Sequence, residues 1–155
     1  MFARALGQFP EQSLIQQTLA TTLTPAVRGQ DLYMLLPMMA NPISQDATWD
    51  FMRKNFEQLH AKAGGGLGGV GVFLYGAGAF CSTEKAEEVK QFFQQHPFPG
   101  TERNQKEALE SIDSCIQLRN QQQKNLATWL KQQGTSVNAG GGSGGGTPVS
   151  GSTMR

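Results

Sequence analysis

The sequence has only two cysteines, two histidines and a formal net charge of +1 among its 155 residues. This near-neutral charge gives no global electrostatic argument for binding nucleic acid or an anionic membrane. No apolar run approaches the roughly 18 residues that a membrane-spanning helix needs. We therefore expect neither nucleic acid nor a membrane among the partners of this chain.

The sequence also lacks the close cysteine and histidine spacings from which metal sites and nucleophilic pairs are built. His60 lies at the end of a predicted helix, and His96 precedes a proline. Cys81 and Cys115 lie on or beside apolar faces, where burial raises the pKa of a thiol and makes it inert. We expect two buried thiols in preference to a disulfide, and no catalytic residue, metal ligand or cofactor site in this chain.

One glycine-rich stretch matches the pattern G-x-G-x-x-G at Gly66, Gly68 and Gly71. A dinucleotide site needs a strand before this pattern and an acidic residue at the end of a second strand. Here a helix is predicted before the pattern, and the next acidic residues open another helix. We interpret the stretch as a loop followed by a short buried helix from Val70 to Phe80, since no second strand is available for pairing.

The most strongly patterned stretch runs from Ser44 to Lys62 and predicts one amphipathic helix. Its apolar side chains recur at steps of three and four residues, as one helix face requires: Trp49, Met52, Phe56 and Leu59. Ser44 is expected to cap the first turn and Lys62 to close the last. Because an apolar stripe needs a partner, neighbouring helices should cover it.

Two helices are predicted before this stretch. The first carries apolar residues from Leu14 to Leu23, with Ser13 as a possible N-cap. The second begins at Asp31 and is apolar nearly all round, and Pro37 should kink it or end it early. Arg28 and Asp31 bracket the start of the second helix and are expected to hold it by hydrogen bonds.

Further helices are predicted after the central stretch. Ser82 should cap a helix whose core side carries Phe92 and Phe93, and the acidic residues of that helix, Glu88 among them, are assigned to its solvated start. A long helix with one polar face follows the next proline-containing break. A second break near Asn120 is expected to separate it from a last short helix.

These patterns predict an all-α protein of stacked helical hairpins, similar to a fragment of a HEAT-like α-solenoid. Residues 1–133 are expected to form the folded domain. Residues 134–155 are rich in glycine, serine and threonine, and they offer almost nothing to bury. They are therefore expected to be a flexible low-complexity tail.

Two segments carry motifs in a recognisable order. The segment from Val27 to Leu59 contains Arg28-x-Gln30-Asp31, Asn41-Pro42 and Trp49-x-Phe51 followed by Lys54-Asn55-Phe56. The segment from Phe80 to Leu118 contains Lys85, Glu88-Val89, Phe92-Phe93 and Arg103, followed by a helix with Leu109 and Ile112. Together they resemble the C-terminal helical-repeat domain of the gluzincin zinc aminopeptidases, the family of aminopeptidase N, puromycin-sensitive aminopeptidase and endoplasmic-reticulum aminopeptidase.

The resemblance extends over nearly all of Phe2 to Gln132 and has two departures. Phe56 stands where family members usually have a second tryptophan. Residues 64–71 form a glycine-rich expansion at a point where the family more often continues into a helix. The zinc ligands, catalytic glutamate and amine-recognition motif of the family lie in domains that are absent here. The resemblance thus implies zinc in the full-length enzyme but none in this chain.

The resemblance implies the terminal part of a shell that closes over the zinc domain, walls off the internal cavity and contacts the distal part of a bound peptide. The implied partners are the upstream catalytic domain and a peptide substrate. The alternative is a free-standing helical-repeat scaffold that binds a peptide or a protein. The sequence leaves the compartment open, with a cytoplasmic location slightly favoured.

A terminal fragment of a solenoid should also have one uncovered end. We expect the first helix to leave an apolar patch partly exposed, formed by Leu14, Ile15, Leu19 and Leu23. The other end, with Lys124, Lys131 and many glutamines, is expected to be a polar cap.

Overall fold

The structure is a computed structural model that describes residue 5, residues 9–64 and residues 67–139. Every regular element in those ranges is helical, so the all-α prediction is confirmed, while the solenoid-like stacking stays a prediction. The chain divides into two units, Met1–Leu118 and Arg119–Arg155, and one helix continues through the boundary. Among the described helices, none combines the length and the apolar character needed to cross a membrane.

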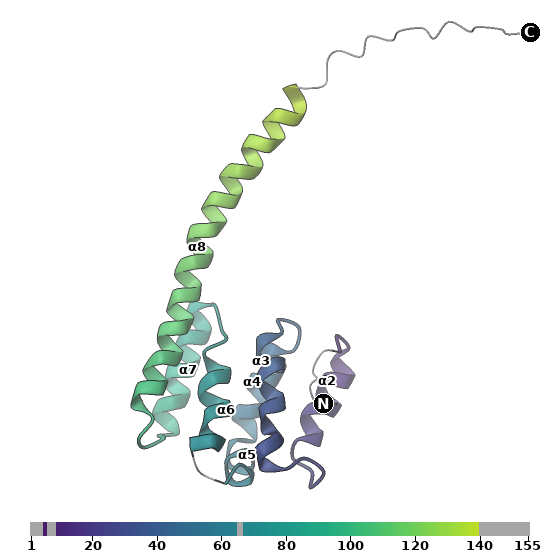
Figure 1. Cartoon of the computed structure of the whole chain (residues 1–155), viewed down its shortest axis with the longest axis vertical. Helices are drawn as coiled ribbons and strands as arrows, with labels where there is room; N and C mark the ends of the chain where they lie inside the picture. Colours follow the sequence, from purple (N-terminus) through teal and green to yellow (C-terminus); the bar gives the residue numbers. More distant parts are fainter. Residues whose placement is uncertain (1–4, 6–8, 65–66, 140–155) are drawn as a thin grey trace, which may run out of the picture. The chain divides into compact units, whose positions relative to one another are not determined.

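From residue 9 onward, the described part of the first unit opens with α2 (Gln12–Thr21), the 3-10 helix η1 (Gly29–Met34) and α3 (Leu35–Ala40) (Figure 1). The helix predicted from Asp31 is therefore divided into two elements. Pro37 lies in the first turn of α3, where a missing backbone N–H breaks no helical hydrogen bond. The proline thus accompanies the start of a helix instead of kinking one.

The N-cap of α2 also differs from the prediction, because Glu11 and not Ser13 occupies it.

The central stretch forms two helices, α4 (Gln45–Lys54) and α5 (Phe56–Lys62), where one was predicted. The interruption is at Asn55, whose side-chain amide donates to the carbonyl oxygen of Phe51 at 2.9 Å. The backbone N–H of Asn55 donates to the same carbonyl at 3.0 Å, so the interruption is a change in the backbone angles of Asn55, to φ −111° and ψ 24°. Ser44 stands at the N-cap of α4, but its hydroxyl donates to the carbonyl oxygen of Met38 at 2.8 Å and does not cap the helix.

Three further helices follow among the described residues: α6 (Leu67–Ala77), α7 (Thr83–Gln95) and α8 (Glu102–Ala139). The predicted helix in the glycine-rich region and the predicted cap at Ser82 are confirmed, since the backbone N–H of Lys85 donates to Ser82 Oγ at 3.3 Å. The expected break near Asn120 is wrong. No glycine or proline interrupts residues 118–133, and leucine, lysine and glutamine there favour a helix.

The backbone of α8 also passes the predicted domain boundary at residue 133 and ends at Ala139. The remainder of the predicted tail, residues 140–155, lies outside the described residues.

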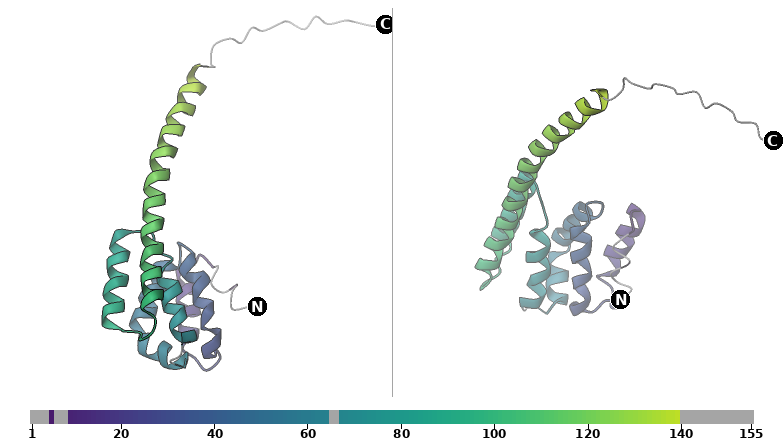
Figure 2. Two further views of the ribbon diagram at one scale, coloured as in Figure 1. Left: turned by 60° about the vertical axis from the view of Figure 1, so that its left-hand side comes forward. Right: turned by 45° about the horizontal axis from the view of Figure 1, so that its top comes forward.

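The core of the first unit lies where α3 packs on α4 and α6, with α2 against α4 and α5 against α6 (Figure 2). A Cβ at Gly29, at the start of η1, would clash with the backbone carbonyl of Lys62, so no larger residue would fit there without a shift. The Lys62 ammonium donates to the carbonyl oxygen of Thr22 at 2.6 Å and to that of Thr24. These contacts join the end of α5 to the segment after α2.

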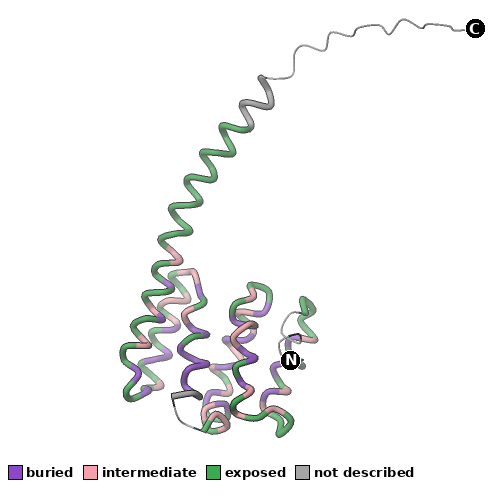
Figure 3. The backbone as a smooth tube through the Cα atoms, in the orientation of Figure 1, coloured by how far each residue is buried: buried purple, intermediate pink, exposed green. Residues whose placement is uncertain are grey.

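The two ends of the described chain differ from the sequence prediction. Ile15 and Leu19 are 0% exposed because α2 packs on α4, so the expected apolar patch is wrong for these two residues. Leu14 and Leu23 are half-buried. The second half of α8, expected to be a polar cap, is exposed along its described residues (Figure 3). Three of these exposed residues are large and apolar, and they are Leu126, Trp129 and Leu130.

Candidate functional site

The residues predicted to form the core all lie in one buried cluster of the first unit. Their exposed fractions range from 0% to 8%, and they are Trp49, Met52, Phe56, Leu59, Phe92 and Phe93. The Trp49 ring meets the Phe92 ring edge to face, with centroids 5.1 Å apart, and the Phe56 ring meets Phe73 in the same way at 5.1 Å. Edge-to-face pairs add to the stabilisation from burial alone. The aromatic cluster therefore joins α4, α5, α6 and α7.

Sequence reasoning missed Phe98, which lies between two prolines in the segment that ends α7. It is 4% exposed, and its ring lies 5.6 Å from the ring of Phe56. A phenylalanine within a helix-stopping segment was a usable signal, because an apolar side chain in an otherwise polar break needs a buried place.

One carboxylate connects this core to a polar network, which we call the Glu88 cluster: Asp46, Trp49, Asp50, Arg53, Lys85 and Glu88. The indole N–H of Trp49 donates to Glu88 Oε1 at 3.0 Å, and an Arg53 guanidinium nitrogen lies 2.8 Å from the same oxygen. The Lys85 ammonium lies 3.1 Å from Glu88 Oε2. Glu88 therefore binds α4 to α7, and its assignment to a solvated helix start is wrong.

The protonation of Lys85 is stabilised within the Glu88 cluster. Burial lowers the pKa of Lys85, but hydrogen bonds to Glu88 and Asp46 outweigh burial and hold the pKa above its ordinary value. Because the pKa is raised by folding, the stabilisation is complete below the pKa of the unfolded chain and is lost as pH rises through the pKa of the folded chain. Lys85 is thus a protonated, charged connection between α7 and the carboxylate of Asp46 on α4.

Replacing Glu88 by alanine should lower the free energy of unfolding by about 1–3 kcal/mol, because the Trp49 N–H would lose its acceptor and Arg53 and Lys85 would lose a carboxylate. The matched control is Glu87→Ala, which removes an exposed neighbour from the same helix and should change stability by about 0.5 kcal/mol or less. Urea denaturation followed by circular dichroism compares the two. Equal shifts of the midpoint would contradict this role of Glu88.

The predicted polar pair is formed at the start of η1. Arg28 Nε donates to Asp31 Oδ2 at 3.0 Å, while the two side chains are 73% and 43% exposed. An ion pair this exposed contributes little to stability. The pair lies at the surface and not at a buried helix start.

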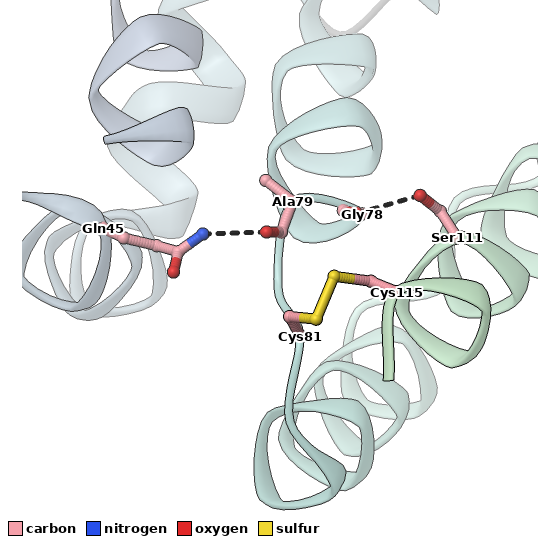
Figure 4. The surroundings of a disulfide bond; sticks show 6 residues. All are labelled: Gln45, Gly78, Ala79, Cys81, Ser111 and Cys115. Atoms are coloured by element: carbon pink, nitrogen blue, oxygen red, sulfur yellow. Dashed lines mark hydrogen bonds between the residues drawn. A yellow bond between two sulfur atoms is a disulfide. The ribbon is translucent and has the colours of Figure 1, made fainter. Parts of the chain in front are cut away.

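The prediction of two free thiols is wrong, because Cys81 and Cys115 form a disulfide with 2.01 Å between the sulfur atoms (Figure 4). Hydrogen bonds flank the bond: Ser111 Oγ donates to the carbonyl oxygen of Gly78 at 3.1 Å, and the Gln45 side-chain amide donates to that of Ala79 at 2.9 Å. The two cysteines are 34 residues apart, and only the packing of the end of α6 on α8 brings them together.

The two thiols are therefore not available as nucleophiles or metal ligands.

A small cavity of about 140 Å³ lies between α6 and the first half of α8. It is lined by Leu74, Tyr75, Gly78, Asn104, Glu107, Ala108 and Ser111. Tyr75 is 66% exposed, and Tyr33, 47% exposed, lies with it near Gly71 of α6. An apolar floor bordered by phenol, amide and carboxylate groups can bind an apolar side chain and hydrogen-bond the backbone that carries it. The cavity holds no nucleophile paired with a base.

The described residues do not form a zinc site. Nowhere in those ranges are three His, Cys, Asp or Glu side chains grouped so that they could hold a metal ion. His60 and His96 both lie against the Phe56 ring, at centroid distances of 5.4 and 4.1 Å. The donor set that a catalytic zinc needs therefore does not fit this part of the chain.

The glycine pattern does not have the surroundings of a dinucleotide site either. The helix α5 precedes it, and Gly68 and Gly71 lie within α6, whereas Gly66 is outside the described residues. A strand followed by a phosphate-binding loop is therefore absent from the described part of this region.

Comparison with known proteins gives a consistent set of matches. The family described as ERAP1-like C-terminal domain matches residues 1–114. Aminopeptidase 2, mitochondrial, of Saccharomyces cerevisiae is 30% identical over 133 residues, which cover 84% of this chain and 14% of that protein. The alanine/arginine aminopeptidase of the same yeast is 27% identical, over 83% of this chain and 15% of the relative. Aminopeptidase M1-C of Oryza sativa subsp. japonica is 27% identical, over 69% of this chain and 12% of that relative.

The chain thus spans only 12–15% of the length of these relatives. The family match covers most of the chain, and the resemblance deduced from the sequence motifs is confirmed. This chain belongs to the ERAP1-like C-terminal domain family, the C-terminal domain of the M1 aminopeptidases.

Proposed function

We propose that this chain is the C-terminal, non-catalytic portion of a zinc-dependent aminopeptidase. In that enzyme it closes the peptide cavity over the catalytic domain and contacts the distal part of the peptide substrate. The observation that carries the proposal is the family match over residues 1–114, in a chain that spans only 14% of its yeast relative. Zinc and the catalytic residues would then belong to the part of the enzyme outside this chain.

The cavity between α6 and α8 supports the proposed contact with peptide. Tyr75 lines it and is largely exposed, and tyrosine buries a large area at low entropic cost when a ligand binds. Asn104 offers an amide to a peptide backbone, whereas Glu107 is 2.8 Å from Arg103 and partly neutralised. The cavity can accept one side chain of an extended peptide and cannot cut it.

A free-standing scaffold that binds a peptide or a protein is the second candidate. The burial of Ile15 and Leu19 favours it, because the first helix is covered within this chain and needs no upstream neighbour to bury these two residues. The candidates differ in one respect: only the first requires the chain to complete a catalytic enzyme.

Purified alone, the chain should bind no stoichiometric zinc and should release no amino acid from aminoacyl reporter substrates. The reason is the missing set of donor side chains. Metal analysis and a reporter assay measure both. The proposal would be contradicted by aminopeptidase activity that co-purifies with the chain at constant specific activity and that disappears in a point variant such as Glu107→Gln.

A further inference from the structure

We infer that the disulfide between Cys81 and Cys115 is a reversible redox switch, which holds the first half of α8 on the end of α6 and so keeps the cavity between these helices formed. A dithiol releases α8, and an oxidant fastens it again. The consequence for the enzyme rests on the proposed function, because this cavity is the contact proposed for the peptide. The switch itself depends only on how α6 and α8 are held together in this chain.

The Cys81 side of the switch is held by the core. Cys81 lies in the short connector between α6 and α7, together with Phe80, which is 2% exposed and whose ring centroid lies 5.7 Å from that of Trp49. The Gln45 side-chain amide donates from α4 to the carbonyl oxygen of Ala79 in the same connector (Figure 4). These contacts do not involve the disulfide, so the connector stays in place when the disulfide is broken.

The Cys115 side of the switch has fewer buried contacts. In the part of α8 whose side chains are described, the buried residues are Ala108 and Ile112. Ile116 is half-buried, and residues 117–133 are all exposed. The disulfide therefore fastens α8 at the point where its burial ends. A helix segment with so little buried surface opens locally at a low free-energy cost once the bond is absent.

The cavity lies beside the disulfide. Ser111, one helical turn before Cys115, and Gly78, three residues before Cys81, both line it. Ser111 Oγ donates to the carbonyl oxygen of Gly78 at 3.1 Å, and a Cβ at Gly78 would lie 3.5 Å from the Cα of Ala108. The wall from α8 is thus close to the wall from α6 but is held there by one exposed hydrogen bond, limited packing and the disulfide. Breaking the disulfide lets the α8 wall move away.

Thiol–disulfide exchange can reach this bond, because both cysteines are half-buried and not enclosed. A thiolate of the dithiol attacks one sulfur atom, the bond between Cys81 and Cys115 breaks, and the other cysteine leaves as a thiolate that takes up a proton. The second thiol of the dithiol then attacks the mixed disulfide and releases the first cysteine. Two electrons and two protons pass to the cysteine pair, and the dithiol becomes a disulfide.

Hydrogen exchange of the isolated chain tests the switch, with dithiothreitol as the dithiol and no denaturant. Alkylation with iodoacetamide should first show that both cysteines have become free thiols. Amides of residues 105–117 in α8 should then exchange at least about tenfold faster, whereas amides of α4 should stay protected over the same labelling time. Oxidised glutathione should restore the bond and the slow exchange.

Two variants are the controls. Ser111→Ala keeps the disulfide and loses only an exposed hydrogen bond, so it should change the exchange of α8 by less than about threefold. Cys81→Ser with Cys115→Ser should exchange fast in α8 both with and without dithiothreitol. Circular dichroism verifies that each variant is folded, and the reduced unmodified chain gives the same comparison without any substitution.

Unchanged exchange in α8 after both thiols are free would overturn the switch, and so would a bond that dithiothreitol does not reduce in the folded chain. Exchange that rises in α4 as much as in α8 would also overturn it, because the disulfide would then stabilise the whole fold and not one helix. None of these results depends on catalysis. A failed switch therefore leaves the proposed function in place, which the zinc and reporter measurements test separately.

Discussion

Replacing Trp49 by alanine should lower the free energy of unfolding by about 3–5 kcal/mol. Trp49 is 0% exposed, and its ring contacts Phe80 and Phe92 edge to face. The substitution would leave a cavity and would also remove the N–H that donates to Glu88. Because a domain typically has only about 5–15 kcal/mol of stability, the loss would be a large share of the total.

The second tryptophan provides the matched control. Trp129 is 53% exposed on α8, so Trp129→Ala should change stability by about 0.5 kcal/mol or less. Urea denaturation followed by circular dichroism at 222 nm is suitable, since it does not depend on tryptophan fluorescence. Similar midpoints for the two variants would mean that Trp49 is not the centre of the core.

Removing the disulfide should have the next largest effect. Cys81→Ser with Cys115→Ser should lower the free energy of unfolding by about 3–4 kcal/mol, because the bond closes a loop of 34 residues in the unfolded chain. The loss should appear as a lower denaturation midpoint of the variant under oxidising conditions. Dithiothreitol should lower the midpoint of the unmodified chain to a similar value.

The double serine variant is also the control for the reductant, since dithiothreitol should not change its midpoint. If the unmodified chain denatures at the same urea concentration with and without dithiothreitol, the bond between Cys81 and Cys115 contributes nothing in solution.

The helical part of this fold could be predicted because its signals are local. Apolar residues at steps of three and four place Trp49, Met52 and Phe56 on one side of the central stretch, and the structure buries all three. The interruption at Asn55 could not be read from that period, because it is a change in the backbone angles of a single residue. Periodicity describes the face of a helix but not its continuity.

Long-range pairs were beyond sequence reasoning for a different reason. Cys81 and Cys115 lie 34 residues apart, and Trp49 and Glu88 lie 39 residues apart. Whether such residues meet depends on how α6, α7 and α8 pack, which no local spacing reports. The charged residues of α7 thus suggested solvent exposure, although Glu88 accepts a hydrogen bond from a buried tryptophan.

The candidate function could be reached only through the order of several weak motifs. Composition and spacing favour neither a metal centre nor a nucleophilic pair, and they indicate no activity. Arg28-x-Gln30-Asp31 and Trp49-x-Phe51 matter because they occur together and in sequence, and the family match covers both. The chemistry of the relatives cannot be assigned from a chain that spans 14% of their length.

The most direct test of the central claim is the hydrolysis of an aminoacyl reporter by the yeast enzyme with and without this chain. Three proteins are compared at equal zinc content: aminopeptidase 2 of Saccharomyces cerevisiae, the same enzyme lacking the matched segment, and the chimera that carries this chain there. If this chain is the non-catalytic C-terminal portion of an aminopeptidase, deletion abolishes kcat/KM and the chimera restores it. A folded chimera that stays as inactive as the deletion, or a deletion as active as the intact enzyme, would contradict the claim.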